Sequence, residues 1–269
     1  MHPTIVKFGP MQITAYGLML AISFVVGVLV ATRRAKKYNI NPNNIIDLAM
    51  IIIISAIFGA RFFYVIFHLN EFKGHWLDVI NPFQSSGEVG IAGLTLLGGL
   101  LLSILTSFIY LHVKKLSFLK FADAIIPAVG LGIFFTRIGC FLTGCCYGVP
   151  TELPWGVVFP SGCAAHFHYG DVHLHPSQLY SSFYGLVIFF GLLLLEKKKM
   201  FDGFLLYWFL ILYGISRFLV DFTRYYETSM RVMGVGISVN QVISLCMILA
   251  GVIFLFVGYK NSAKPAVKK

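Results

Sequence analysis

Apolar residues run along this chain in long stretches that polar connections separate. A helix needs about 20 predominantly apolar residues to cross the hydrocarbon core of a bilayer. About seven stretches of that length are present, and each predicts a membrane-spanning helix. They cover residues 13–31, 46–67, 92–112, 121–141, 178–196, 202–221 and 239–258. The pattern therefore predicts an all-α, polytopic membrane protein, with residues 1–269 forming a single transmembrane domain.

Composition agrees with this class. Of the 269 residues, 58% are hydrophobic and only 12% are charged, which excludes a soluble domain with a polar surface. No short apolar region followed by a small-residue cleavage site stands at the N-terminus. We therefore expect the first span to be retained rather than removed as a signal peptide.

The positive charges orient the spans. Alternate connections hold 14 of the 21 Lys and Arg residues, in clusters at 33–37, 114–120, 197–199 and 260–269. The positive-inside rule places those connections in the cytoplasm, with the N-terminus outside and the C-terminus cytoplasmic. The net charge of +10 then reflects topology and anionic headgroups, so we expect no nucleic-acid partner. The connection at about 142–177 becomes an outward-facing loop or head region.

Three arginines, Arg61, Arg137 and Arg217, stand within or at the end of apolar stretches. Such charges are rare in membranes and mark functional sites, so together they suggest a site for an anionic ligand. Arg137 is the best phosphate candidate, because Gly139 and Gly144 follow it and glycine-rich backbone can donate N–H groups. Arg61, with Tyr64 one turn further, is either part of the site or structural.

One helical face of the sixth span carries Tyr213, Arg217, Asp221 and Arg224. In one interpretation Arg217 and Asp221 only neutralise each other across a turn. In the other, the face borders a headgroup cavity in which Arg217 binds phosphate and Asp221 orients it.

Four cysteines follow in the outer region: Cys140, Cys145, Cys146 and Cys163. A disulfide to Cys163, or free buried thiols, is the first interpretation for this compartment. A metal site with histidines of the same loop is an alternative, although the spacing fits no familiar zinc pattern. A catalytic thiol is a third. Cys246 lies deep in the last span, where we expect its side chain to serve helix packing. We expect neither a resident metal nor a cofactor.

Two further segments have alternative interpretations. His175, Ser177, Gln178 and Tyr180 lie at the mouth of the fifth span, where they either reach the headgroup layer or merely cap and anchor a helix. The pair Gly98–Gly99 allows either a lipid or a neighbouring helix to approach the backbone.

Several motifs resemble those of the bacterial phosphatidylglycerol:prolipoprotein diacylglyceryl transferase family. They occur in family order along nearly the whole chain, and the stretch from Arg137 to Gly148 is the most specific. The motifs are Ala15–Leu18, Gly59–Val65, Arg137–Gly148, Pro154–Pro160, His175–Tyr180, Tyr213–Asp221 and Asn240–Ser244.

The resemblance implies seven spans and outward-facing chemistry. It also implies functional arginines at Arg137 and Arg217, with Tyr16, Tyr213 and Asp221 nearby. Such enzymes transfer a diacylglyceryl group from phosphatidylglycerol to the cysteine thiol of a prolipoprotein in the bacterial cytoplasmic (inner) membrane. The partners implied are phosphatidylglycerol, or another anionic phospholipid, and a prolipoprotein signal peptide.

Three positions depart from the family pattern. Leu97 replaces a motif histidine, and Cys140 and Cys145 stand where the family has Asn and Glu. The anion-binding half of the site is therefore retained, while the half that activates or recognises the acceptor is altered. His175 ranks first as a replacement base on side-chain chemistry alone. The alternatives are a transferase of the same fold with another acceptor, and a non-catalytic phospholipid-binding or transport protein.

Overall fold

The structure, a computed structural model, describes residues 4–8, 11–72, 95–226 and 237–262. Helices dominate this part of the chain, beside one short hairpin of β1 (Thr4–Phe8) and β2 (Met11–Thr14). The helices are α1 (Ala15–Ala35), α2 (Pro42–Phe67), α3 (Leu96–Val113), α4 (Phe118–Thr143), α5 (Ala164–Tyr169), α6 (Ser177–Glu196), α7 (Phe204–Asp221) and α8 (Val239–Ser262). Two short 3₁₀ turns, η1 (Lys36–Tyr38) and η2 (Leu69–Phe72), follow α1 and α2.

These helices confirm the predicted class. Six of the described helices are long and apolar enough to cross a membrane, and α3 contributes a shorter apolar helix at Leu97–Val113. Large apolar side chains such as Phe58 (68% exposed) and Phe108 (58%) point outward, as lipid-facing residues do. The chain is therefore a polytopic membrane protein with about seven apolar helices.

Local capping sets several helix ends. Thr14 accepts the backbone N–H of Gly17 at the start of α1, and Asn41 precedes Pro42 at the start of α2. Gly144 ends α4 in the left-handed conformation that glycine adopts most easily. The predicted span 46–67 therefore misses the first turn of α2, because apolar runs do not include polar caps.

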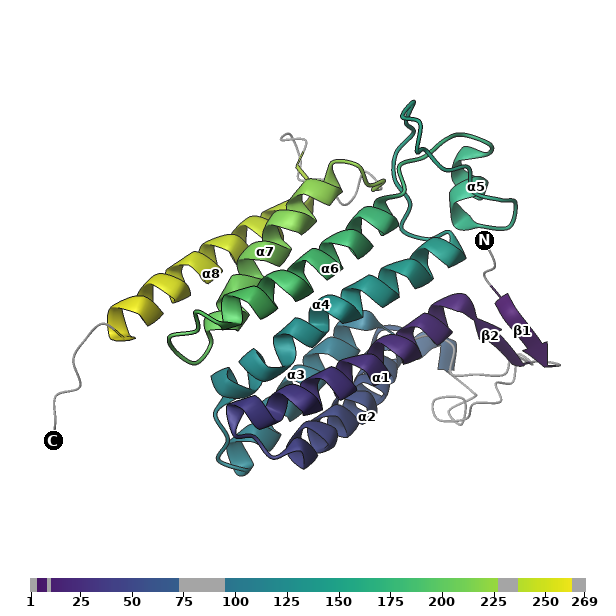
Figure 1. Cartoon of the computed structure of the whole chain (residues 1–269). Helices are drawn as coiled ribbons and strands as arrows, with labels where there is room; N and C mark the ends of the chain where they lie inside the picture. Colours follow the sequence, from purple (N-terminus) through teal and green to yellow (C-terminus); the bar gives the residue numbers. More distant parts are fainter. Residues whose placement is uncertain (1–3, 9–10, 73–94, 227–236, 263–269) are drawn as a thin grey trace, which may run out of the picture.

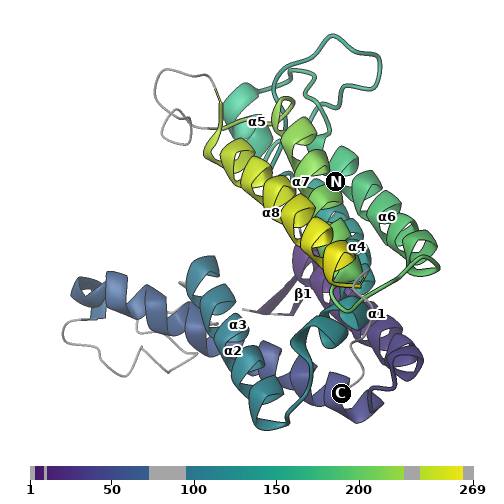
Figure 2. The ribbon, with the colours of Figure 1, turned by 90° about the vertical axis from the view of Figure 1, so that its left-hand side faces the viewer.

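Helix α4 lies at the centre of the bundle. It contacts α1 on one side and α6 and α7 on the other, while α7 pairs with α8 (Figure 1). Helices α2 and α3 pair with each other and lean away from α6, α7 and α8 (Figure 2). The α2–α3 pair meets the rest of the bundle mainly through α1, which leaves room between α2 and α4.

Glycines allow the closest helix contacts. A Cβ on Gly98 would lie 2.3 Å from the carbonyl oxygen of Gly59, and one on Gly99 would lie 2.8 Å from that of Ala56. Helices α4 and α6 meet in the same way at Gly130 and Gly185. These positions therefore serve close helix packing.

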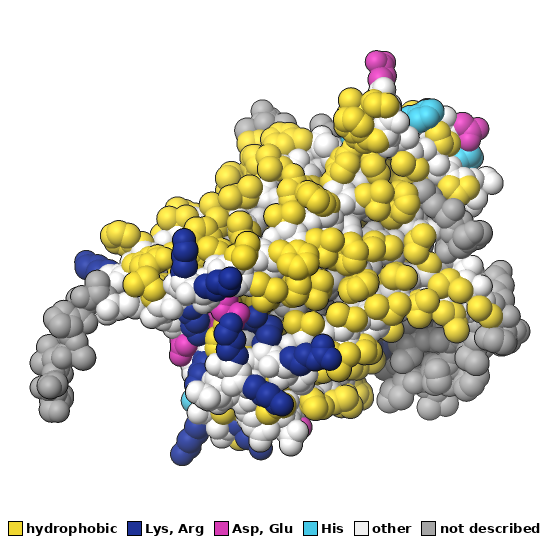
Figure 3. Space-filling view, viewed as in Figure 1, with side chains coloured by type: hydrophobic (Ala, Val, Ile, Leu, Met, Phe, Trp, Pro, Cys, Tyr) yellow, Lys and Arg dark blue, Asp and Glu magenta, His cyan; other side chains and the backbone are white. Residues whose placement is uncertain are grey.

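Basic side chains gather where α1 ends and α4 begins, at the end of the bundle opposite α5 (Figure 3). There the carboxylate of Glu196 accepts hydrogen bonds from the side chains of Arg34 at 3.0 Å, Lys37 at 2.8 Å and Tyr38 at 2.7 Å. This grouping agrees with the predicted cytoplasmic side, and the orientation itself stays a prediction.

A buried carboxylate joins two helices at this basic end. Asp123 of α4 accepts the backbone N–H groups of Gly203 and Leu205, each at 2.9 Å, and pairs with Lys199 at 3.1 Å. A carboxylate at a helix N-terminus satisfies free N–H groups and the helix dipole. Asp123 therefore fixes the start of α7 against α4.

The segment between α4 and α6 forms a small head. Its core contains Phe159, Cys163, Ala165 and Leu174, all nearly inaccessible to solvent. Isolated backbone bridges join Leu174 to Pro150 and Val157. This segment is therefore folded around a core of its own, and its outward-facing position stays a prediction.

Candidate active site

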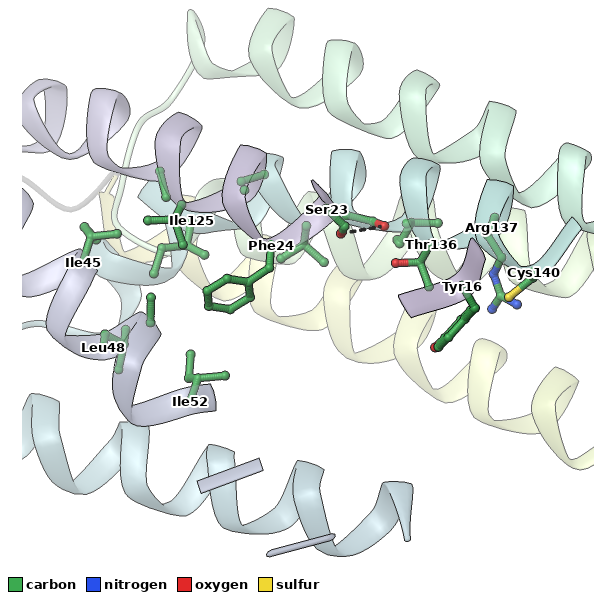
Figure 4. Close-up of a pocket in the computed structure, with 18 of the residues that line it drawn as sticks. Tyr16, Ser23, Phe24, Ile45, Leu48, Ile52, Ile125, Thr136, Arg137 and Cys140 are labelled. Carbon is green, nitrogen blue, oxygen red and sulfur yellow. Dashed lines mark hydrogen bonds between the residues drawn. The ribbon is translucent and has the colours of Figure 1, made fainter. Parts of the chain in front are cut away.

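A cavity of about 700 Å³ lies between α1, α2 and α4. Most of its wall is apolar and comes from side chains of all three helices, among them Phe24, Leu48, Ile52 and Ile125 (Figure 4). Cavities of this size, apolar with a few polar groups, are typical of small-molecule sites.

The polar groups of this cavity converge at the end near the head. Tyr16 from the first turn of α1, Arg137 and Cys140 from α4, and Cys145 and Cys146 from the following loop all line it. Figure 4 shows Tyr16, Arg137 and Cys140 together at one end, while Ile45 and Leu48 lie at the other. Arg224, which follows α7, completes this end.

Arg137 also borders a second cavity of about 40 Å³, which Tyr184, Tyr213 and Arg217 line from the other side. Arg137 thus separates the two cavities. Among the described residues no ion pair or hydrogen bond engages its guanidinium group. Its electrostatic neighbours are the thiols Cys140 and Cys146 and the phenols Tyr213 and Tyr226. An arginine held this way is suited to an anionic ligand.

Arg217 is engaged by the protein itself. Its Nη2 lies 3.4 Å from Oδ1 of Asp221 one turn later, and it also donates to the hydroxyl of Tyr226. Its Nη1 is buried with no partner in the described part of the chain. Arg217 thus combines the structural ion pair with one donor that remains for a ligand in the small cavity.

Asp221 acts as an anchor for two later segments. Tyr226 donates to its Oδ1 at 2.6 Å, and Ser238 donates to its Oδ2. Ser238 and Gln241 form a capping box at the start of α8, with reciprocal bonds of 3.0 and 2.9 Å. Burial and the bond to Asp221 raise the pKa of Tyr226, which keeps this phenol a donor. Asp221 therefore positions Arg217, Tyr226 and the start of α8.

The three cavity thiols meet because α4 ends in a Schellman turn. The N–H of Cys145 donates to the carbonyl of Cys140 at 3.1 Å, and that of Gly144 donates to Phe141 at 3.2 Å. This reversal folds Cys145 back over Cys140, and Cys146 turns the chain again with φ of 59°. The three Sγ atoms all lie within 4.8 Å of one another.

All five cysteines are free thiols. The disulfide between the Cys145–Cys146 pair and Cys163 is therefore not formed. Cys163 instead packs against Gly144, where a Cβ would lie 2.5 Å from the Cys163 Cβ. The head core thus holds Cys163 on the other side of the turn, apart from the cavity thiols.

Neighbouring groups shift the pKa values of the two loop thiols, Cys145 and Cys146. Hydrogen bonds from Cys140 and Cys145, helped by the cations Arg224 and Arg137, lower the pKa of Cys146. Hydrogen bonds with Cys140 and Cys146 raise the pKa of Cys145. The two loop thiols are therefore shifted in opposite directions.

Comparison with known proteins agrees with this geometry. The family model described as prolipoprotein diacylglyceryl transferase matches residues 3–257. The chain belongs to the prolipoprotein diacylglyceryl transferase family. It is 32% identical over 256 residues to a phosphatidylglycerol–prolipoprotein diacylglyceryl transferase of Clostridium tetani, with 95% of this chain and 97% of the relative covered. The enzyme of that name from Photobacterium profundum is 34% identical over 268 residues, with 98% and 96% covered.

Membership makes the chain a membrane-embedded transferase. The family resemblance of the Arg137–Gly148 segment coincides with the part of the chain that lines the polar end of the cavity. Gly139 in this segment also brings α1 close, because a Cβ there would lie 3.2 Å from Cα of Tyr16. The Arg137–Gly148 segment therefore both lines the cavity and sets how closely Tyr16 approaches α4.

The sequence pattern placed Arg224 on the same helical face as Arg217 but did not include it among the candidate site residues. Its backbone forms an antiparallel bridge with Gly148, and its guanidinium lies over the Tyr226 ring at 5.2 Å. Its buried Nε has no partner among the described residues. The sequence did not indicate that Arg224 lies at the cavity, because the bridge to Gly148 joins segments more than seventy residues apart.

Ser177 and Gln178, in the first turn of α6, hold two different segments. Ser177 donates to the carbonyl of Thr223, after α7, at 2.9 Å. Gln178, 1% exposed, donates from Nε2 to the carbonyl of Cys145 in the loop after α4 at 2.7 Å. Contact of either residue with substrate stays a prediction.

His175 and Tyr180 line neither cavity. Nδ1 of His175 lies 3.2 Å from the Tyr180 hydroxyl, which accepts Trp155 Nε1 at 2.8 Å. Burial lowers the pKa of His175. Since His175 lines neither of the cavities that Arg137 borders, its first rank as a base rests on residue type alone.

The remaining predicted residues lie on the α2–α3 pair and line neither cavity. The Arg61 guanidinium packs over the rings of Tyr64 and Phe72, at 5.8 and 5.1 Å. Gly98 and Gly99 form the helix contact described above, so the packing interpretation holds for them. Leu97 is 58% exposed at the start of α3.

Proposed function

We propose that the large cavity is where this chain transfers a diacylglyceryl group from phosphatidylglycerol to the lipobox cysteine of a prolipoprotein. Family membership and the relatives' names support the reaction. The single observation that carries the site is Arg137, which borders both cavities and has no ion-pair or hydrogen-bond partner in the described part of the chain.

The phosphate of the lipid would bind Arg137 at the polar end. Arg224 and the free Nη1 of Arg217 lie on the same end of the bundle and supply further donors. Guanidinium groups bind phosphate through paired, charge-assisted hydrogen bonds. The acyl chains would then extend along Phe24, Leu48 and Ile125 in the apolar part.

The transfer itself joins sulfur to carbon. The acceptor thiolate attacks the glycerol carbon that carries the phosphate ester. A C–S bond forms, the C–O bond to phosphate breaks, and glycerol phosphate leaves with the electron pair. Arg137 stabilises the charge on the departing phosphate. The same cationic surroundings lower the pKa of an incoming thiol, so its proton passes to water without a dedicated base.

Complementation of a strain with a conditional transferase tests this proposal, with mass spectrometry of a reporter lipoprotein. The wild-type chain should give the diacylglyceryl adduct. Arg137→Ala removes charge-assisted contacts of about 1.5–3 kcal/mol each, so the adduct should fall by at least about tenfold. Arg33→Ala, a change at an exposed arginine of the basic end, is the matched control. An adduct at wild-type level from well-expressed Arg137→Ala would reject this role.

A second candidate is transfer of a phospholipid-derived group to a different acceptor. The thiols at Cys140 and Cys145, where the resemblance leads us to expect Asn and Glu, favour it because they line the cavity beside Arg137. An unmodified reporter from well-expressed wild-type chain, together with turnover of phosphatidylglycerol, would select this alternative.

A further inference from the structure

The cavity holds a cluster that the transfer reaction does not use. Cys140, Cys145 and Cys146 place three sulfur atoms within 4.8 Å of one another. Two of the three come from the turn and not from the helix. A continuous helix would point the side chains of residues 140, 145 and 146 in different directions. The cluster therefore depends on the Schellman turn and on the left-handed conformation of Cys146.

The turn is held from several sides. Gln178 binds the carbonyl of Cys145, and Gly144 packs on Cys163. Gly148 donates to the carbonyl of His175 at 3.1 Å just after the thiols. The sulfur atoms therefore have a fixed arrangement before any ligand binds, which lowers the entropy cost of binding.

We propose that these three cysteines form a binding site for one thiophilic metal ion, of the Zn²⁺, Cd²⁺ or Cu⁺ class. A metal–sulfur bond of about 2.3 Å places the sulfur atoms of a trigonal site roughly 4.0 Å apart. The observed cluster needs only shifts below about 1 Å to reach that geometry. Soft thiolate ligands select this class of ion over Mg²⁺ or Ca²⁺.

The charges around the cluster fit a metal-thiolate complex. A divalent ion bound by three cysteine thiolates forms a complex of net charge −1. Arg137 and Arg224 line the same end of the cavity and stabilise that negative charge. Among the described residues that line the cavity none is acidic, so the three sulfur atoms are the soft ligands that this wall offers.

An occupied metal site would compete with the lipid. The anionic complex and a phosphate group would use the same arginine, Arg137. Resting on the proposed function, we therefore expect the metal ion to inhibit transfer by at least about tenfold when the site is filled.

Titration of the purified full chain with Cd²⁺ tests the site. The protein is first reduced and freed of reductant under inert gas, with five free thiols verified. Thiolate-to-metal charge-transfer absorbance and elemental analysis should show one Cd²⁺ per chain. Cys145→Ser should lose that ion, whereas Cys163→Ser and Cys246→Ser, which change thiols outside the cluster, should retain it.

Fully reduced wild-type protein that binds no stoichiometric Cd²⁺, or unchanged binding in Cys140→Ser and Cys145→Ser together, would overturn the proposal. The transfer assay separates this failure from failure of the proposed function. Reduced, metal-free chain that modifies the reporter keeps the transfer role whatever the titration shows. A chain that binds Cd²⁺ but never modifies the reporter keeps the metal site alone.

Discussion

The side-chain amide of Gln178 donates to the backbone carbonyl of Cys145 across 2.7 Å. This bond joins the first turn of α6 to the loop that follows α4. Since Cys145 and its neighbour Cys146 line the large cavity, a residue that lines neither cavity fixes the wall of the site.

Gln178→Glu should loosen this loop. A carboxylate cannot donate to the Cys145 carbonyl, and loss of a buried hydrogen bond costs about 1–3 kcal/mol. Alkylation of Cys145 and Cys146 by a maleimide, followed by peptide mass spectrometry, should speed up several-fold. Gln12→Glu, at an exposed position of β2, should leave the rate unchanged. Equal alkylation rates in both variants would show that the loop does not depend on this bond.

Gly148→Ala should destabilise the head. A Cβ there would lie 2.4 Å from the carbonyl oxygen of His175 and 2.5 Å from that of Thr223, so backbone must shift. Overpacking of this kind costs about 1–3 kcal/mol. Thermal unfolding in detergent should show a lower Tm. The control is Gly27→Ala, where nothing lies within 4 Å, and a similar loss of Tm in that variant would discount the contact.

Arg224→Ala should reduce transfer without unfolding the chain. Its Nε is buried without a partner in the described residues, and it lines the same cavity as Cys146. Loss of one charge-assisted contact to phosphate predicts a reduction of about tenfold or more. Reporter modification measures it, with Arg33→Ala as the comparison. Arg224→Lys, which keeps the charge, should recover part of the activity; no recovery would point to a packing role.

Exchange of Arg217 and Asp221 should not restore the structure. A simple i,i+4 pair tolerates such a swap. Here Asp221 also accepts Tyr226 and Ser238, and an arginine at 221 cannot accept either bond. The double variant Arg217→Asp with Asp221→Arg should therefore have a Tm at least as low as Asp221→Ala. A Tm near the wild-type value would assign the pair to charge neutralisation alone.

His175 should make stability depend on pH. Burial lowers its pKa below the value of about 6.5 that imidazole has in the unfolded chain. Below that pH the unfolded chain binds a proton that the folded chain resists, so stability is complete above it and falls as the pH falls. His175→Gln should flatten the decline of Tm between about pH 7 and 5.

The exposed His173, changed to Gln, is the control for this pH dependence. Its slope should match that of the wild type. If His175→Gln kept the full slope as well, the acid sensitivity would belong to another group.

The sequence alone predicts the helices well, and the reason is physical. A bilayer requires each span to be apolar over its whole length, so the pattern of residues 178–196 almost coincides with α6. Where a polar cap sets the end of a helix, the predicted and observed ends differ by a few residues, as at Asn41 and Pro42 at the start of α2. The Gly144 turn was also within reach, because glycine after a helical stretch is the usual terminator.

The site was harder to predict because spacing along a helix says nothing about pairing between loops. Arg61 and Arg137 stand in similar apolar surroundings in the sequence. In the structure the first packs on aromatic rings, whereas the second lies between two cavities. The bridge that brings Arg224 beside Gly148 joins distant segments, and only the folded chain reveals it.

The glycine contact between α2 and α3 has an effect beyond its own surface. Ile45, Leu48 and Ile52 of α2 line the large cavity, and further along α2 Gly59 packs against Gly98 of α3. A side chain added at either glycine would push the two helices apart and move the cavity wall with them. The width of the cavity therefore depends partly on residues that do not line it.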